Sequence, residues 1–184
     1  MFIDLETERL FLKRIVYDDA EFFYKQFSTA EVNRYLYDVE PCGSVEEARK
    51  WIDLYVESEP RNQHRWIILL KETGEKIGTC GFHCWNRENG EIELGYDLQP
   101  SYWRHGYTSE ALRAIIKFAA EKMKVKRIFA HISVDNAASI LVSEKMGFVK
   151  TGEHYFEEFR GKEYLHEVYC LDLEADSGSG AVHN

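Results

Sequence analysis

The sequence predicts a mixed α/β domain with a central, mostly antiparallel twisted sheet of about seven strands and flanking helices. Three observations support this fold class. Most strand-like segments follow one another through short polar turns, as antiparallel neighbours do. Other segments repeat apolar residues at the three- and four-residue steps of helices. One such helix separates two strand-like segments, and a helical crossover makes those two strands parallel.

Length and composition fit one domain over residues 1–174. The chain has 184 residues, of which 45% are hydrophobic and 14% aromatic, enough to fill one core. Residues 175–184, ADSGSGAVHN, are small and polar, and we expect them to be disordered. The opening MFIDLETERLFLKR mixes charges through its apolar residues, unlike a signal peptide or a membrane span. We therefore expect a cytoplasmic protein that does not bind membranes.

The formal net charge of −9 argues against nucleic-acid binding as the main activity. Proteins that bind the phosphate backbone usually display a basic surface. The charge favours cationic substrates instead, although many proteins are acidic merely for solubility.

The N-terminal part of the chain predicts one strand and two helices. Residues 9–15 alternate in polarity and begin the sheet. Asp18 and Asp19 can cap the first helix. Ser44 and Glu47 form a capping box at the start of the second helix. The apolar residues of the two helices are Phe22, Phe23 and Phe27, and Ala48, Trp51, Ile52 and Tyr55.

The middle of the chain predicts a meander of strands followed by the central helix. RWIILLKE, EKIGTCGFHCWN and EIELGYDL are joined by turns at Thr73-Gly74 and Asn89-Gly90. The helix that follows leads to RIFAHISV, which would run parallel to EIELGYDL. Its apolar face consists of Leu112, Ile115, Ile116, Ala119 and Met123.

The C-terminal part predicts a helix and a hairpin that completes the sheet. The helix runs from Asn136 to Met146, and Gly147 closes it as a left-handed cap. FVKTGEHYFEEF and KEYLHEVYCLDL are joined at Arg160-Gly161 and form the hairpin.

The turn SYWRHGYT leads directly into the central helix and is a candidate anion site. Unpaired backbone N–H groups and the positive end of the helix dipole meet there, which suits a phosphate or pyrophosphate. Gly106 allows the backbone to approach a ligand closely, and Thr108 or Ser109 can cap the helix. An ordinary strand-to-helix turn with a cap is the alternative interpretation.

The segment Cys80-Gly-Phe-His83-Cys84 suggests a metal site, but strand geometry argues against one. In a regular strand Cys80 and Cys84 share one face about 13 Å apart, and His83 points to the other face. We therefore expect no metal site and no disulfide between these two cysteines. The histidines His64, His83, His105, His131, His154 and His166 are scattered along the chain, and nothing in the sequence places them around one centre. Buried, reduced thiols are expected for Cys42, Cys80, Cys84 and Cys170.

The stretch YWRHGYTSEAL, followed by N-A-A-S-x-x-x-x-E-K-M-G-F, resembles the acetyl-CoA core of the GNAT superfamily of N-acetyltransferases. More narrowly, the chain is similar to the ribosomal-protein N-terminal alanine acetyltransferases, from TERLFLKRI to GKEYLHEVYCLDL. It departs from their pattern at Arg104 and His105, where a small residue is common, but Gly106 is kept. The resemblance implies a GNAT fold with a splayed parallel strand pair, and acetyl-CoA as co-substrate.

The resemblance also implies where the cofactor binds. Backbone N–H groups from Arg104 through Thr108 would hold the pyrophosphate, and His105 could add positive charge. The strand stretch from Tyr96 to Leu98 would pair with the pantetheine arm beside Gly95, which fits a bulge or a packing site. Asn136 would contact the cofactor or act as a plain N-cap. The implied set is Tyr96, Asp97, Leu98, Arg104, His105, Gly106, Tyr107, Thr108, Asn136 and Ser139.

Glu93 and Ser143 are the candidate catalytic residues. Glu93 lies where relatives often carry a general base that acts directly or through water, and partial burial would raise its pKa. A solvated strand residue is the alternative for Glu93, and Glu91 shares its face. Ser143 stands where many GNAT enzymes have a tyrosine, and it could donate a hydrogen bond to the leaving thiolate. Otherwise solvent would reprotonate the sulfur.

The acceptor would be a primary amine, and the resemblance favours the N-terminus of a protein such as a ribosomal protein. A small amine (a polyamine, amino sugar or amino acid derivative) is the first alternative, and a non-catalytic module that binds coenzyme A is the second. Trp85, Trp103 and Tyr155 could line the acceptor pocket or pack in the core. Relatives often form homodimers, so we include a homodimer among the expectations.

Overall fold

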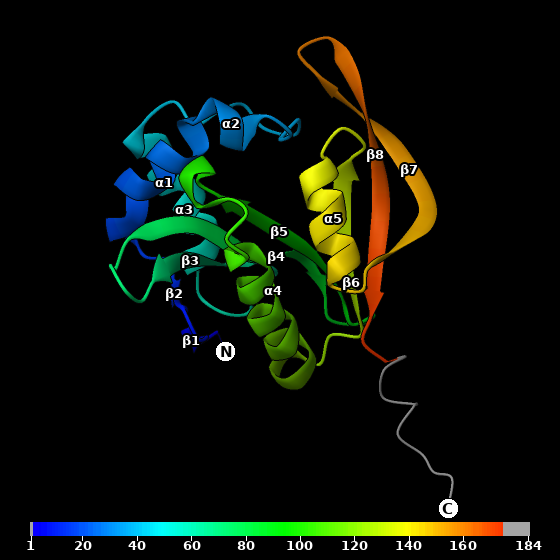
Figure 1. Ribbon diagram of the computed structural model, residues 1–184, viewed down its shortest axis with the longest axis horizontal. Coiled ribbons are helices and arrows are strands. Elements are labelled where there is room, and N and C mark those ends of the chain that lie inside the picture. The colour runs from blue at the N-terminus through cyan, green and yellow to red at the C-terminus, as the bar shows by residue number, and fades with distance from the viewer. Residues whose placement is uncertain (1, 175–184) are drawn as a thin grey trace, which may run out of the picture.

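In the computed structural model, which describes residues 2–174, eight strands form one sheet (Figure 1). Across the sheet the strands follow the order β1-β2-β3-β4-β5-β6-β8-β7. They are β1 (Leu5–Glu6), β2 (Leu10–Arg14), β3 (His64–Leu70), β4 (Lys76–Asn86), β5 (Glu91–Leu98), β6 (Arg127–Ser133), β7 (Val149–Phe159) and β8 (Lys162–Asp172). The predicted fold class is confirmed, and the short strand β1 is an addition to it. The predicted disorder of residues 175–184 lies outside the described part of the chain.

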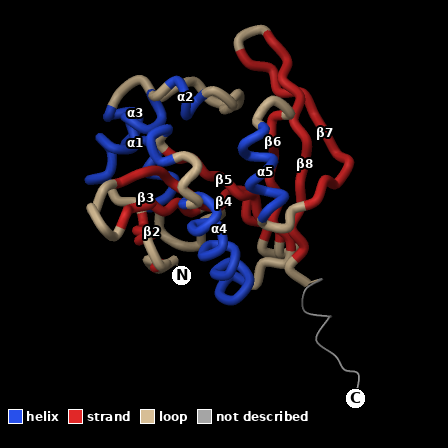
Figure 2. Tube along the Cα trace, viewed as in Figure 1, coloured by secondary structure: helices blue, strands red, loops and turns tan. Residues whose placement is uncertain are grey.

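Helices cover both faces of the sheet (Figure 2). They are α1 (Ala20–Ser28), α2 (Ala30–Asn33), α3 (Val45–Val56), α4 (Tyr107–Phe118), which continues as a π-helical turn (Ala119–Met123), and α5 (Ala137–Lys145). Strand β3 shows how both cores are built, because its side chains alternate. Trp66 and Ile68 are buried with α4 on one face, and Ile67 is buried with α1 and α3 on the other. Within residues 2–174, no helix has the length and apolar character needed to cross a bilayer.

The parallel pair β5–β6 opens partway along its length. The two strands are paired at Glu91–Arg127, Ile92–Ile128 and Glu93–Phe129, and the pairing stops there. Strand β5 continues to Leu98 and stays paired with β4 on its other side. Beyond Glu93, one edge of β5 therefore has no strand partner. The predicted splayed pair is confirmed, and Glu93 stands at the point of separation.

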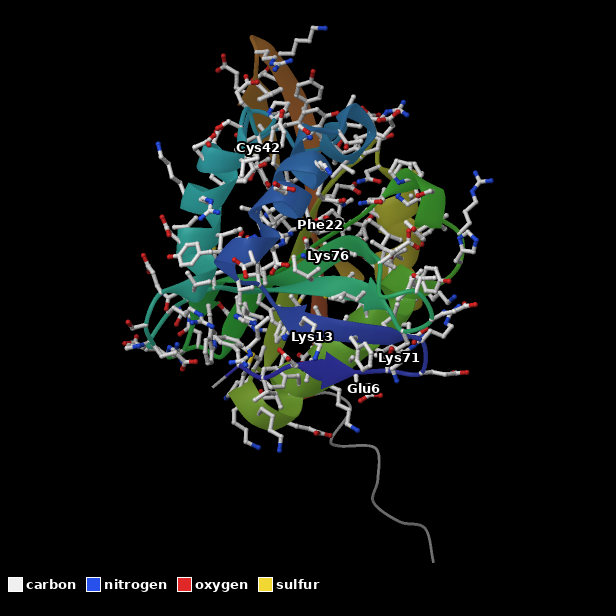
Figure 3. The ribbon with its side chains drawn as sticks, turned by 90° about the vertical axis from the view of Figure 1, so that its left-hand side faces the viewer. Glu6, Lys13, Phe22, Cys42, Lys71 and Lys76 are labelled. Atoms are coloured by element: carbon white, nitrogen blue, oxygen red, sulfur yellow. The ribbon has the colours of Figure 1, made fainter. Side chains whose placement is uncertain are left out.

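The two N-terminal helices begin differently from each other. Helix α3 has the predicted cap, since Ser44 Oγ accepts a hydrogen bond from the backbone N–H of Glu47 at 3.1 Å. Asp19 makes no capping hydrogen bond to α1 itself, but it caps the 3-10 turn (Tyr17–Asp19) that leads into α1, since its Oδ2 accepts from the Val16 N–H at 2.8 Å. Its other carboxylate oxygen pairs with Lys76 of β4 at 2.5 Å, and the Lys76 ammonium lies 5.9 Å from the centre of the Phe22 ring (Figure 3). This ion pair ties the start of α1 to the sheet.

His64 at the start of β3 is a buried histidine held in its neutral form. Its ring stacks on Phe2 with centroids 4.0 Å apart, and its Nδ1 accepts a hydrogen bond from Arg61 Nη2 at 2.9 Å. Burial, helped by the nearby positive charge of Arg61, lowers the pKa of His64 to about 3. The folded state therefore resists protonation at this ring.

We expect the free energy of unfolding to fall as the pH is lowered from about 6.5 toward 3. His64 alone should contribute up to about 1.4 kcal/mol of this loss per pH unit. The reason is that the unfolded chain takes up a proton at the ordinary histidine pKa, and the folded chain does not. Urea unfolding of the wild type and of His64→Gln across this pH range measures the effect. The variant should lose less stability than the wild type, and parallel pH profiles would show that His64 is not the source.

Candidate active site

The loop before α4 presents the start of this helix to solvent. Gly106 is the N-cap residue and has a left-handed conformation, with φ of +80°. The predicted cap by Thr108 or Ser109 is wrong, because the helix already begins at Tyr107 and no side chain caps it. The backbone N–H groups of the first turn are therefore directed at the loop, together with the positive end of the helix dipole. This geometry suits an anion.

Arg104 gives the loop a second left-handed residue, with φ of +66°. For a residue with a side chain this conformation costs about 1–2 kcal/mol, which explains why a small residue is common at this position. Hydrogen bonds fix the loop around it. Trp103 Nε1 donates to the Leu98 carbonyl at 2.7 Å, and His105 Nδ1 lies 2.8 Å from the Trp103 carbonyl. The loop is thus tied to the end of β5.

Arg9, just before β2, supports the same loop and was missed by the sequence analysis as a site residue. It donates to the His105 carbonyl at 3.1 Å and pairs with Glu110 of α4 at 2.7 Å. Its guanidinium carbon lies 4.6 Å from the centre of the Tyr107 ring. An ideal Cβ placed on Gly106 would lie 3.6 Å from Arg9 Nη2. A cation thus stands beside the candidate anion site, contributed by a segment far away in the sequence.

Side chains of β5 and α5 meet across the open edge of β5. The Tyr96 hydroxyl lies 2.6 Å from Ser139 Oγ. Asn136 is the N-cap of α5, since its Oδ1 accepts from the Ser139 N–H at 3.1 Å, so the N-cap interpretation holds. Ser143, one turn further along α5, is buried. Its Oγ lies close to the Tyr96 hydroxyl but makes no hydrogen bond of standard geometry to a described residue. Such a hydroxyl is free to bond a ligand that enters between β5 and α5.

Asp97 contributes its backbone to the open edge, but its side chain is used on the opposite face of the sheet. Gln26 of α1 donates to Asp97 Oδ1 at 2.7 Å, and Arg65 of β3 pairs with Oδ2 at 3.3 Å. The Thr79 hydroxyl also donates to this carboxylate. These contacts hold α1 against the middle of the sheet. Any contact of Asp97 with a ligand at the open edge is therefore made by its main chain.

Glu93 is flanked by two histidines from the neighbouring strands. His83 of β4 is its cross-strand partner, with Nε2 3.1 Å from Glu93 Oε2. His131 of β6 approaches from the other side, with Nε2 4.0 Å from the same oxygen. The sequence analysis found no such grouping, because the three residues come together only through strand register. The hydrogen bond from His83 holds the pKa of Glu93 below its ordinary value, so the expected rise through burial is wrong.

Cys84 lies on the same side of the sheet as Glu93, contrary to expectation. A register shift between His83 and Asn86 and a left-handed φ of +52° at Cys84 break the alternation of β4. As a result Cys84 is exposed, whereas Cys80, in the regular part of the strand, is fully buried. The ligand atoms of His83, Cys84 and Glu93 all lie within 4.8 Å of one another. The expectation that His83 and Cys84 point to opposite faces of the sheet is therefore wrong. All four cysteines are free, with Cys42 and Cys80 buried and Cys170 half-buried.

A row of aromatic side chains continues from Glu93 toward the β7–β8 hairpin. Tyr155 of β7 lies 5.6 Å from His131 and stacks at 5.2 Å on His166 of β8. Tyr37, in the loop after α2, stacks at 3.6 Å on Tyr164 of β8 and meets His166 edge-on. These rings form one wall beside the candidate base. Of the other predicted pocket residues, Trp85 is buried in the core and Trp103 anchors the loop before α4.

The splayed parallel pair and the glycine-led start of α4 agree with the GNAT fold that the sequence resembles. The family described as the acetyltransferase (GNAT) domain matches residues 9–149, and the chain belongs to this family. It is an N-acetyltransferase.

The relatives show what this chain is similar to. It is 37% identical over 174 residues to the uncharacterized N-acetyltransferase YoaA of Bacillus subtilis, covering 93% of this chain and 97% of that protein. It is 29% identical over 126 residues to the ribosomal-protein-serine acetyltransferase of Escherichia coli, covering 68% and 67%. A structure of spermidine N-acetyltransferase from Vibrio cholerae with CoA and spermine has a TM-score of 0.80 at 18% identity, covering 90% of this chain and 96% of that one.

Proposed function

We propose that this enzyme transfers the acetyl group of acetyl-CoA to the N-terminal amine of a protein, such as a ribosomal protein. The observation that carries the proposal is the position of Glu93. It lies where β5 and β6 part, between the open edge of β5 and the aromatic wall of Tyr155 and His166. A carboxylate at this point can accept a proton from an amine that enters beside the aromatic wall, while a thioester lies along the open edge of β5.

The cofactor half of the site fits coenzyme A in three respects. Gly106 leaves the first-turn N–H groups of α4 accessible to a pyrophosphate, the exposed Arg104 adds charge, and Arg9, which is paired with Glu110, braces the loop. The open edge of β5 offers main-chain groups from Tyr96 onward to the amide-containing pantetheine arm. The buried Ser143 hydroxyl lies close to that of Tyr96 without a hydrogen bond of standard geometry, so it can bond a ligand that enters there. When bound, acetyl-CoA supplies the activated acyl group.

Glu93 handles the proton of the acceptor amine. Its lowered pKa keeps it ionised at neutral pH, so it is ready to accept a proton but is a weak base. A weak base suffices once the amine attacks, because a nitrogen that has bonded to the acyl carbon becomes far more acidic. Glu93 takes this proton directly or through a water molecule, and His83 steadies the carboxylate through its hydrogen bond.

The leaving thiolate needs hydrogen-bond donors on the α5 side. Ser143 is the predicted donor, and its hydroxyl is buried near Tyr96. Tyr96 adds a second hydroxyl that reaches the same helix through Ser139. A phenol is the stronger acid of the two, so Tyr96 complements the serine that stands where many family members have a tyrosine. We assign both hydroxyls to stabilising the sulfur.

Two lines of support favour a protein acceptor. The Escherichia coli relative is named a ribosomal-protein-serine acetyltransferase, and another in Bacillus subtilis is named a putative ribosomal N-acetyltransferase. At the point where β5 and β6 part, Glu93 is accompanied by histidines and aromatic rings, which suits an acceptor with one amine followed by an uncharged chain.

A small polycationic amine is the second candidate, and a separate observation favours it. Asp38 and Glu157 lie close enough to Tyr155 to act on it electrostatically together with Glu93. Several carboxylates along one wall could bind the additional ammonium groups of a polyamine. The net charge of −9 also favours cationic ligands.

An acceptor panel tests the proposal. Acetyl-CoA would be paired with peptides that begin with serine or alanine, with spermidine and spermine, and with amino sugars and amino acids, and coenzyme A release would be followed with a thiol reagent. We expect kcat/KM for at least one free peptide to exceed that for spermidine by at least about tenfold, a difference of about 1.4 kcal/mol in transition-state stabilisation. An N-terminally blocked peptide of the same sequence, with an internal lysine, is the matched control and should not react.

The other outcomes are equally informative. A preference for polyamines over peptides would make a polyamine, and not a protein N-terminus, the acceptor. If no acceptor reacts although coenzyme A binds tightly, the non-catalytic binding module would be favoured. A cytoplasmic location, a homodimer and the absence of nucleic-acid and membrane binding accompany the proposal as predictions.

A further inference from the structure

We propose that His83, Cys84 and Glu93 form a binding site for a zinc ion, and that zinc bound there inhibits acetyl transfer. The ligand atoms of these side chains lie within 4.8 Å of one another. They offer an imidazole nitrogen, a thiol sulfur and a carboxylate oxygen, which are the donor types that zinc prefers. Two come from adjacent positions of β4 and one from the facing position of β5, so paired backbones hold all three.

The separations are close to those that a tetrahedral zinc ion requires. Zinc–ligand distances of about 2.0–2.3 Å place the ligand atoms about 3.3–3.8 Å from one another. His83 Nε2 and Glu93 Oε2 are already 3.1 Å apart. Small rotations of the exposed Cys84 side chain would bring its sulfur into range.

The backbone at Cys84 provides an independent observation. A cysteine rarely adopts a φ of +52°, and the cost is about 1–2 kcal/mol. This conformation, together with the register shift of β4, turns the thiol out of the core and toward Glu93. Without it, Cys84 would share the buried face of Cys80, and the cluster would not exist.

The surroundings of these three side chains allow an ion to enter. They also keep one coordination position of that ion open. Cys84 borders an open surface hollow of about 540 Å³ that Asn62 and Asn86 also line, so a hydrated ion can reach it. The nearby cation of Arg87 is directed away, since its guanidinium stacks on Trp85 at 3.6 Å and donates to the Arg61 carbonyl. Three protein ligands leave the fourth position to water, as in other open zinc sites.

Inhibition follows from the identity of one ligand. A zinc ion bound to Glu93 occupies the carboxylate oxygens that would otherwise take the proton of the amine. On binding, the Cys84 thiol also gives up its proton and becomes a thiolate ligand. The inhibition rests on the proposed function of Glu93, whereas metal binding does not depend on it.

Cobalt(II) is a suitable probe of metal binding, because it takes zinc sites and its bond to a thiolate absorbs light. The full chain with reduced thiols should show a thiolate-to-cobalt band and the visible bands of tetrahedral cobalt at one equivalent, and zinc should abolish both. Cys84→Ser should lose the thiolate band, and His83→Gln should bind at least about tenfold more weakly, about 1.4 kcal/mol. Cys170→Ser, a matched change at the half-buried thiol of β8, should retain the wild-type spectrum. An absent thiolate band in the wild type, or an equal band in Cys84→Ser, would overturn the site.

The inhibition is tested separately, by detecting the acetylated product by mass spectrometry so that zinc cannot interfere with a thiol reagent. Zinc should lower the wild-type rate and a chelator should restore it. Cys84→Ser, compared with its own zinc-free rate, should need at least about tenfold more zinc for half inhibition. If cobalt binds as described but zinc leaves the rate unchanged, the metal site stands, and both the inhibition and the assignment of Glu93 as the base are wrong.

Discussion

Replacing Gly106 by valine is expected to weaken coenzyme A binding by at least about 100-fold, equivalent to about 2.7 kcal/mol. Gly106 has a φ of +80°, and its missing side chain leaves the N-terminus of α4 uncovered. A β-branched residue there both opposes the left-handed conformation and covers the N–H groups proposed to hold the pyrophosphate. Each charge-assisted hydrogen bond lost costs about 1.5–3 kcal/mol, so losing one or two accounts for the expected change. Isothermal titration with coenzyme A measures it.

The control for this prediction separates backbone strain from lost binding. Gly152 of β7 also has a left-handed conformation, with φ of +91°, and an added Cβ there would meet nothing within 4 Å. Gly152→Val should cost comparable stability in thermal unfolding and leave coenzyme A affinity within about twofold of the wild type. Wild-type affinity in a folded Gly106→Val protein would contradict the placement of the pyrophosphate at this helix.

Changing Glu93 to glutamine is expected to lower kcat by about 10²–10⁴-fold, the usual contribution of a general base. Glutamine has nearly the same shape and can still accept the hydrogen bond from His83, but it cannot take up the proton of the amine. The dissociation constant for coenzyme A should stay close to that of the wild type, because the proposed cofactor contacts lie elsewhere. Steady-state kinetics with the best acceptor of the panel, together with coenzyme A titration, measure both quantities.

Glu91 provides the matched control on the same strand. It pairs with Arg127 of β6 at the closed end of the parallel pair, two positions before Glu93 and away from the open edge. Glu91→Gln should leave kcat within about twofold of the wild type. Equal rates for Glu93→Gln and the wild type would remove Glu93 from the mechanism.

The sequence alone determined the main helices and strands, their order and the glycine-led loop before α4. The alternation along residues 9–15 and the three- and four-residue spacing along α4 are local patterns, and a strand and a helix formed where these patterns occur. The turn before α4 was also predictable, because a glycine at the start of a helix has few structural meanings. The helical crossover was enough to predict that β5 and β6 run parallel.

The tertiary structure alone decided which distant side chains meet and how they are charged. Arg9 reaches the loop before α4 through the packing of β2 beside α4, and His131 reaches Glu93 through the register of β5 and β6. The pKa of Glu93 falls because a cross-strand histidine donates to it, whereas burial alone would have raised it. At Cys84 a single left-handed residue reversed the face that strand alternation assigns. Periodic patterns fix the direction of side chains only while the backbone stays regular, and contacts between strands depend on register, which no local stretch of sequence contains.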